Sequence, residues 1–204
     1  MDAVHIVAYV EVAPPSMPAA LALVRRYREA TARGDGSLRC EVLQRIGQPH
    51  QLATLEVWRD QASLEAHARQ VSTTEAREGL AAIRIAPLDE RIHHALSVGA
   101  AVGTALPPGA IHVVTHVDVI PPRKDDGAAA LESLARVSRA SAGNLRFDVV
   151  QQASRPNHFT VIETWTDARA AEAHSMAAPT RAFRDALSPV TGALYDERFY
   201  LTVD

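Results

Sequence analysis

The chain repeats itself at a fixed spacing of 107 residues, and this repeat constrains the fold more than any other feature of the sequence. The segment Glu56–Asp60 (EVWRD) returns as Glu163–Asp167 (ETWTD), and Glu65–His67 returns as Glu172–His174. No gap is needed to align the two copies. The sequence therefore predicts two copies of one domain.

The domain boundaries follow from the limits of this alignment. A length of 204 residues suits two domains of about 100 residues each. Glycine, proline and small residues gather between the copies, as expected of a linker. We expect domains at residues 1–97 and 108–204, with a linker at 98–107.

Each copy shows the same order of strand and helix patterns. A β-branched run ends at a Pro-Pro pair, which lacks the N–H groups needed to continue a strand. An amphipathic helix follows, with Ser16 or Asp125 as its expected cap. Two alternating strands, an Ala-rich helical segment and a last strand complete each copy. The expected segments of the first copy are 4–12, 16–34, 38–58, 61–83 (with a break near Ser72) and 88–96.

This β-α-β-β-α-β order predicts an α+β fold with two tandem ferredoxin-like domains. In the strand before Trp165, one face carries Phe159 and Val161, whereas the other carries Ile162. Both faces of the sheet are therefore partly apolar, and a lone domain would leave one of them in water. We expect the covalently attached copy to cover it, so that the two domains form an intramolecular dimeric α+β barrel.

Composition excludes several classes of function. A net charge of −3 provides no basic surface for nucleic acid. The single cysteine, Cys40, cannot form an internal disulfide, and no secretory leader or ~20-residue apolar span is seen. A cytoplasmic protein without membrane contact is expected. No phosphate-binding glycine loop, His-x-x-x-His helix or cysteine pair occurs, so we expect no metal and no cofactor.

The repeated Glu-x-Trp-x-Asp and Glu-Ala-His segments, with Tyr195–Arg198, resemble the antibiotic biosynthesis monooxygenase (ABM) family of dimeric α+β barrels. The resemblance covers nearly the whole chain twice, and its local pattern is most similar to quinol monooxygenases. It implies a ligand pocket in each half, between the helices and the sheet. Haem-degrading members have an Asn, a Trp and an axial His where this chain has Ala8, His67 and Ala76, so haem degradation is disfavoured.

The candidate catalytic residues are a tryptophan, a histidine and a glutamate. A Trp ring could stack on a planar substrate, and a neutral imidazole could accept a phenolic proton. The plainer alternatives are core packing for the Trp, a capped half-exposed histidine, and an ion pair between the glutamate and one of Arg39, Arg91, Arg146 and Arg198. The catalytic candidates are His174, Trp165, Glu163, His67 and Trp58.

The substrate-binding candidates lie in the second copy, which holds all four phenylalanines. Because aromatic residues are concentrated there, we expect an aromatic-lined working pocket within residues 108–204, and a first copy that only completes the barrel. Drift in core packing is the alternative explanation. The candidates are Arg146, Arg198, Phe159, Phe183, His116 and Tyr195.

The expected function is a cofactor-independent monooxygenase that oxidises a quinol or polycyclic phenol with molecular oxygen. In this mechanism His174 deprotonates the substrate, whose carbanion then donates an electron to oxygen. The partners would be a small aromatic or quinol-like substrate and oxygen, with a homodimer of two-domain chains left open. Two other function classes also remain open: a non-catalytic module for metabolite binding or assembly, and an isomerase of a small metabolite.

Overall fold

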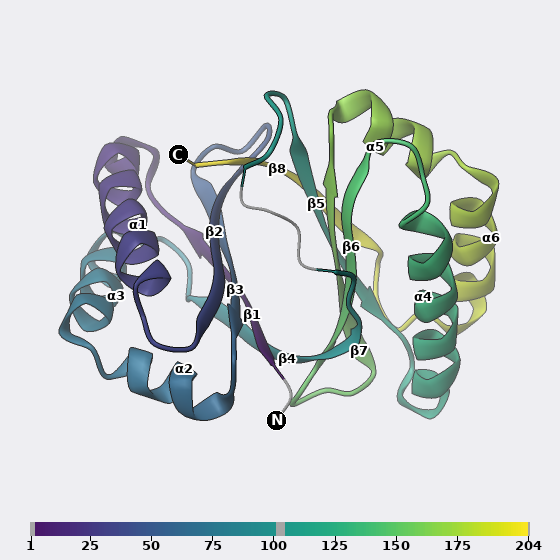
Figure 1. Ribbon diagram of the computed structural model, residues 1–204, viewed down its shortest axis with the longest axis horizontal. Helices are drawn as coiled ribbons and strands as arrows, with labels where there is room; N and C mark the ends of the chain where they lie inside the picture. The colour runs from purple at the N-terminus through teal and green to yellow at the C-terminus, as the bar shows by residue number, and fades with distance from the viewer. Residues whose placement is uncertain (1–2, 101–104, 204) are drawn as a thin grey trace. The chain divides into compact units, whose positions relative to one another are not determined.

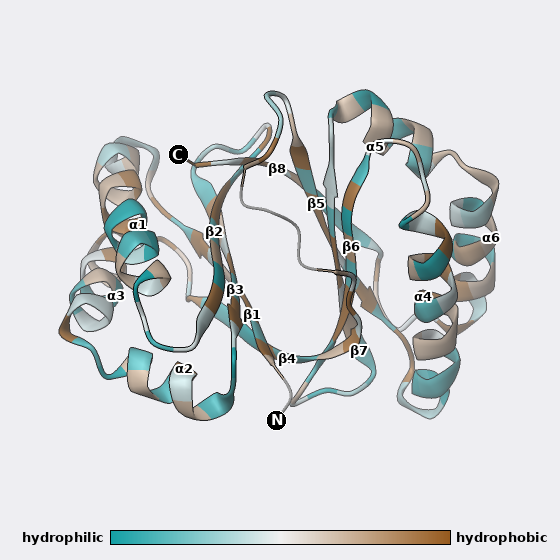
Figure 2. Ribbon diagram, viewed as in Figure 1, coloured by the Kyte–Doolittle hydropathy of each residue, from teal (hydrophilic) through white to brown (hydrophobic). Residues whose placement is uncertain are grey.

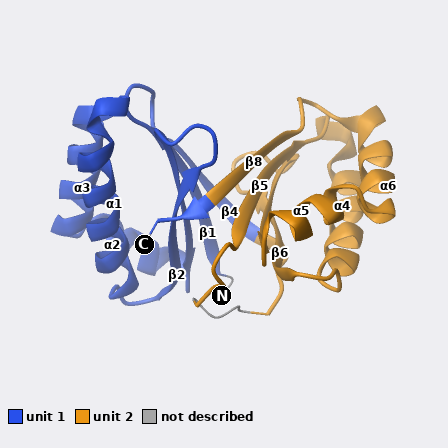
Figure 3. Cartoon of the chain, turned by 90° about the horizontal axis from the view of Figure 1, so that it is seen from above, with its two compact units in different colours: residues 1–94, 201–204 blue, residues 95–200 orange. Residues whose placement is uncertain are grey.

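The computed structural model describes residues 3–100 and 105–203 and divides into two compact units (Figures 1 and 3). One unit comprises residues 1–94 and 201–204, and the other comprises residues 95–200. The last residues group with the first unit because the Val203 amide donates to the Val42 carbonyl at 2.8 Å. Part of the expected linker, residues 101–104, lies outside the described residues.

Both repeats have the expected ferredoxin-like β-α-β-β-α-β order. Each Ala-rich segment is broken into two helices, as the sequence suggested. The elements of the first repeat are β1 (Val4–Glu11), η1 (Pro14–Ser16), α1 (Met17–Ala32), β2 (Ser37–Arg45), β3 (Gln51–Trp58), α2 (Gln61–Ala68), α3 (Val71–Ile83) and β4 (Asp89–Ser97). Those of the second are β5 (Ile111–Asp118), η2 (Pro121–Arg123), α4 (Lys124–Ser138), β6 (Asn144–Gln152), β7 (His158–Trp165), α5 (Ala168–Ser175), α6 (Ala178–Leu187), η3 (Ser188–Val190) and β8 (Asp196–Thr202).

The strands pair in the same antiparallel pattern in the two repeats. Strand β1 lies between β3 and β4, and β3 also pairs with β2. In the second repeat, β5 lies between β7 and β8, and β7 also pairs with β6. The complete hydrogen-bonded order, β1-β3-β2-β8-β5-β7-β6-β4, is that of a closed barrel, which confirms the predicted fold class.

The helix caps differ from the sequence prediction. Ser16 makes no side-chain cap because it has helical dihedral angles and ends a 3-10 turn, and α4 begins one residue before Asp125. The effective caps are Asp60 and Asp167, whose carboxylates accept the backbone N–H groups of Ser63 and Ala170. The aspartate of the repeated Glu-x-Trp-x-Asp segment therefore begins α2 and α5.

One face of each sheet packs against the helices. In β7 this face carries Phe159, Val161 and Trp165, all buried in a single core cluster with side chains of α4 and α6. Figure 2 shows hydrophobic residues along the strands, whereas α1 and α4 carry hydrophobic and hydrophilic residues side by side. Because successive strand residues alternate between faces, this packing fixes which side chains can reach the space between helices and sheet.

Candidate functional site

A glutamate, a tryptophan and a histidine meet in the second repeat where β7 leads into α5. Trp165 Nε1 donates to Glu163 Oε2 at 2.8 Å, and the Trp165 ring stacks on His174 with 4.6 Å between centroids. His174 Nε2 lies 4.0 Å from Glu163 Oε2 and 3.4 Å from Thr180 Oγ1. All three candidates are buried. The structure thus brings together the residues that the sequence singled out.

The first repeat holds the same arrangement with one addition. Trp58 Nε1 donates to Glu56 Oε2 at 2.9 Å, and the Trp58 and His67 rings lie 4.6 Å apart. The Tyr27 hydroxyl also donates to Glu56 Oε1, at 2.7 Å. The residue equivalent to Tyr27 in the second repeat is Leu134, so only the first repeat supplies this second donor to its glutamate.

Burial shifts the pKa values of these groups toward their neutral forms. Desolvation raises the pKa of Glu163 to about 8 and lowers the pKa of His174 to about 4. The pKa of Glu56 is also raised by burial, although the hydrogen bonds from Tyr27 and Trp58 oppose the rise. Glu163 can therefore hold or exchange a proton near neutral pH, whereas His174 is neutral there and only weakly basic.

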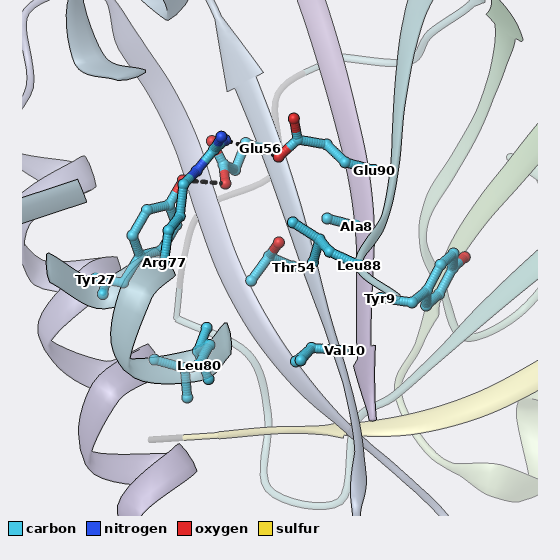
Figure 4. Close-up of a pocket in the computed structure, with 12 residues that line it drawn as sticks. Ala8, Tyr9, Val10, Tyr27, Thr54, Glu56, Arg77, Leu80, Leu88 and Glu90 are labelled. Atoms are coloured by element: carbon cyan, nitrogen blue, oxygen red, sulfur yellow. Dashed lines mark hydrogen bonds and ion pairs between the residues drawn. The ribbon is translucent and has the colours of Figure 1, made fainter. Parts of the chain in front are cut away.

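The larger of the two equivalent pockets lies in the first repeat, between helices α1 and α3 and strands β1, β3 and β4 (Figure 4). Its volume is about 50 Å³. The hydrogen-bonded Tyr27 and Glu56 lie on one side, and Arg77 Nη2 donates to Glu90 Oε2 at 2.8 Å beside them. Tyr9 points away from this group in Figure 4. The remaining lining residues are mostly apolar: Ala8, Val10, Val24, Thr54, Ala76, Leu80 and Leu88.

The equivalent pocket of the second repeat is nearly filled. Its volume is about 10 Å³, which holds at most about one water molecule. Phe147 stands where the first repeat has Cys40, and Phe183 stands where it has Ala76. Phe147, Tyr195 and Phe199 line this pocket, whereas Phe183 is buried in the adjoining core cluster. The expected aromatic-lined pocket within residues 108–204 is thus present but smaller than its equivalent in the first repeat, and which of the two is the working pocket stays a prediction.

Three of the predicted substrate-binding residues lie on the other face of the sheet. In the register of β6 and β7, Phe147 is opposite Glu163 and Arg146 is opposite Thr164, so Arg146 and Glu163 point to opposite faces. Arg146 instead donates to Asp148, two residues along its strand, at 2.5 Å. The same alternation places Arg198 beside Asp196 and His116 beside Thr160.

The expected ion pair between the glutamate and a strand arginine is therefore wrong in both repeats. Each of the four candidate arginines pairs with a carboxylate two residues away on its own strand. These pairs are Arg39–Glu41, Arg91–Asp89, Arg146–Asp148 and Arg198–Asp196. Residue types alone do not give the pairing register, which places these arginines and the glutamates on opposite faces of the sheet.

The other three substrate-binding candidates lie on the helix side of the sheet. Tyr195 lines the small second pocket. Phe159 and Phe183 are buried in the core cluster beside it.

The arginine that does reach each pocket comes from a helix and was missed. Arg77 of α3 pairs with Glu90, and Arg184 of α6 pairs with Glu197 at 3.4 Å. Arg77 and Glu90 recur as Arg184 and Glu197 at the spacing of 107 residues, so the repeat could have indicated this pair. Tyr27 had no such signal, because the second repeat has a leucine in its place.

Within residues 3–100 and 105–203, no group of three or more His, Cys, Asp or Glu side chains is arranged to hold a metal ion. None of the helices in this part of the chain is long and apolar enough to span a membrane.

Comparison with known proteins agrees with the fold and the repeat. Over 68 residues the chain is 28% identical to "Putative monooxygenase YcnE" of Bacillus subtilis (strain 168), which covers 33% of this chain and 72% of that protein. Crystal structures of putative monooxygenases from Lactobacillus acidophilus NCFM and Fusobacterium nucleatum match 100% of this chain and 95% and 93% of theirs, with TM-scores of 0.80 and 0.89 at 12% identity.

The model of the family described as "Antibiotic biosynthesis monooxygenase" matches the chain twice, at residues 3–79 and 110–186. These two matches account for most of both repeats. The chain therefore belongs to the antibiotic biosynthesis monooxygenase family.

Proposed function

We propose that the chain is a monooxygenase that oxidises a small quinol, and that the pocket of the first repeat is its working site. The observation that supports this most strongly is the buried carboxyl group of Glu56, which lines a mostly apolar pocket of about 50 Å³. This carboxyl group accepts hydrogen bonds from Tyr27 and Trp58. The pocket can bury an aromatic ring while the carboxylate meets a phenolic hydroxyl.

Glu56 is the proposed general base. A base is most effective when its pKa lies near the working pH, and burial moves the pKa of Glu56 upward from that of an ordinary carboxyl group. Trp58 and His67 do not line the pocket, and we assign them to positioning. Trp58 holds the Glu56 carboxylate by a hydrogen bond, and His67 packs against the Trp58 ring in a tilted arrangement.

The reaction balances with oxygen as the only co-reactant. Glu56 accepts a phenolic proton, and the electron-rich ring passes one electron to oxygen. The resulting superoxide and ring radical combine to form a carbon–oxygen bond. The O–O bond of the peroxide then breaks, so that one oxygen atom stays on the ring as a carbonyl and the other leaves as water with two hydrogens from the substrate. The product is a hydroxyquinone.

The volume of the pocket favours one ring over several. A cavity needs about 10–15 Å³ to hold one water molecule, so about 50 Å³ corresponds to only a few water-sized groups. A single-ring quinol suits this space better than a polycyclic phenol.

The second repeat supplies the alternative catalytic set. His174, Trp165 and Glu163 repeat the geometry of the first site, including the Trp-to-Glu hydrogen bond. We assign them a structural role because the adjoining pocket is about 10 Å³.

Oxygen uptake with isotope labelling tests the proposed function. Purified protein is mixed with hydroquinone in buffer under ¹⁸O₂, and an oxygen electrode and a mass spectrometer follow the reaction. We expect uptake faster than autoxidation without protein, with one labelled oxygen atom in each product molecule. Hydroquinone that binds and is recovered unchanged would contradict the proposal and support a binding module.

A further inference from the structure

We propose that Ala76 of α3 is the residue that determines which rings the first pocket accepts, and that Phe183, its equivalent on α6, closes the second pocket. This inference rests on the proposed function only in taking an aromatic ring as the ligand.

The position of Ala76 between two cavities is the first observation. Its side chain lines the pocket of about 50 Å³ that contains Glu56, and it also lines a crevice of about 160 Å³ between α1 and α3. The other residues of the crevice are Leu23, Arg26, Ser72 and Glu75. A ligand that enters through this crevice therefore passes the Ala76 methyl group before it reaches Glu56.

The second observation comes from comparing the two repeats. At the position of Ala76 the second repeat has Phe183, which is buried in the core cluster together with Phe147. The pocket there has a volume of about 10 Å³, although the Glu–Trp–His arrangement beside it is the same. A large side chain at this helix position therefore accompanies a filled pocket, and a methyl group accompanies an open one.

The ligand class follows from what lines the first pocket. Apolar side chains such as Val24, Leu80 and Leu88 can surround a ring. The hydrogen-bonded Tyr27–Glu56 and Arg77–Glu90 pairs provide polar atoms on one side, and Thr54 adds a hydroxyl group to the lining. A single aromatic ring with a hydroxyl group matches this lining. Because Ala76 lines the pocket on the side of the crevice, a larger side chain at position 76 leaves less space for the ring.

Calorimetric titration with hydroquinone under nitrogen tests the proposal without turnover, since oxygen is excluded. We expect wild-type protein to bind one hydroquinone per chain. Ala76→Phe, which copies the second repeat, should weaken binding by roughly tenfold or more. Ala81→Phe is the matched control because Ala81 is exposed on the same helix, and its affinity should equal that of the wild type. If Ala76→Phe does not fold, Ala76→Val should show a smaller loss in the same direction.

The reverse substitution tests the second pocket. Phe183→Ala, examined with a thermal melt to establish that it folds, should raise the stoichiometry toward two hydroquinones per chain. Wild-type affinity in a folded Ala76→Phe variant, or no hydroquinone binding to wild type at all, would overturn the inference. A binding pattern as expected without any oxygen uptake in air would instead leave the inference intact and refute only the monooxygenase proposal.

Discussion

Burial gives Glu163, the glutamate of the second repeat, a protonation state that its sequence context does not reveal. In the second repeat, desolvation raises the pKa of Glu163 from 4.5 to about 8, against the opposing effect of the hydrogen bond from Trp165. Glu163 is therefore mostly protonated near pH 7. His174, whose Nε2 lies 4.0 Å from Glu163 Oε2, is neutral at this pH because burial lowers its pKa to about 4. The pair is therefore a neutral acid beside a neutral imidazole.

The raised pKa of Glu163 predicts how stability depends on pH. Between pH 4.5 and about 8 the native state holds a proton that the unfolded state has lost, so the free energy of unfolding falls as pH rises. Glu163→Gln removes this dependence while keeping an acceptor for Trp165. The stability of wild type relative to this variant should fall by a few kcal/mol from pH 5 to pH 8, since each pKa unit corresponds to about 1.4 kcal/mol.

Urea unfolding at several pH values provides the measurement. Glu172→Gln is the control, because Glu172 is an exposed glutamate on the adjacent helix and its substitution should leave the pH profile of the wild type unchanged. A stability difference between wild type and Glu163→Gln that stays constant with pH would show that Glu163 ionises alike in the folded and unfolded states.

At the scale of elements, a glycine turn fixes how the first helix meets the second strand in each repeat. Gly36 follows α1 with a φ of +80°, and an added Cβ would lie 2.2 Å from the Ser63 hydroxyl oxygen on α2. Gly143 has a φ of +78° and would meet the Ala170 side chain in the same way. This packing against the first turn of the next helix explains why the glycine appears in both copies.

Gly36→Ala should therefore destabilise the protein more than the same substitution at a left-handed glycine that has free space around it. Gly47 is the matched control, because it has a φ of +79° but nothing within 4 Å of an added Cβ. Gly47→Ala should cost about 1–2 kcal/mol from backbone strain alone. Gly36→Ala adds the clash with Ser63 and should cost more, by roughly 1–3 kcal/mol. Equal midpoints of thermal unfolding in the two variants would contradict this account.

The elements themselves were largely predictable from the sequence. The order of strands and helices and the break in each Ala-rich segment follow from periodicity and from the repeat. The caps at Ser16 and Asp125 were wrong because a 3-10 turn precedes each helix, which residue preference alone does not show. The ion pairs of Arg146 and Arg198 were wrong because the pairing register decides the face of the sheet.

At the scale of the whole molecule, the repeat predicted two equivalent sites but not which one is open. The concentration of aromatic residues in the second copy predicts the working pocket there. In the structure, the repeat with the smaller residues Cys40 and Ala76 has the larger cavity, and the repeat with Phe147 and Phe183 has the smaller one. Pocket volume depends on side chains from several helices and strands at once, which no pattern along the chain records. The domain boundaries at residues 97 and 108 stay a prediction.

The central claim is that one chain carries two copies of a Glu–Trp–His arrangement and works with the first. Glu56→Gln and Glu163→Gln are matched substitutions at equivalent positions, and each keeps an acceptor for its tryptophan. In an oxygen electrode with hydroquinone, Glu56→Gln should lose roughly a hundredfold or more of the uptake rate, as expected for removal of a general base, whereas Glu163→Gln should retain most of it. Loss of uptake in Glu163→Gln with full activity in Glu56→Gln would contradict the account.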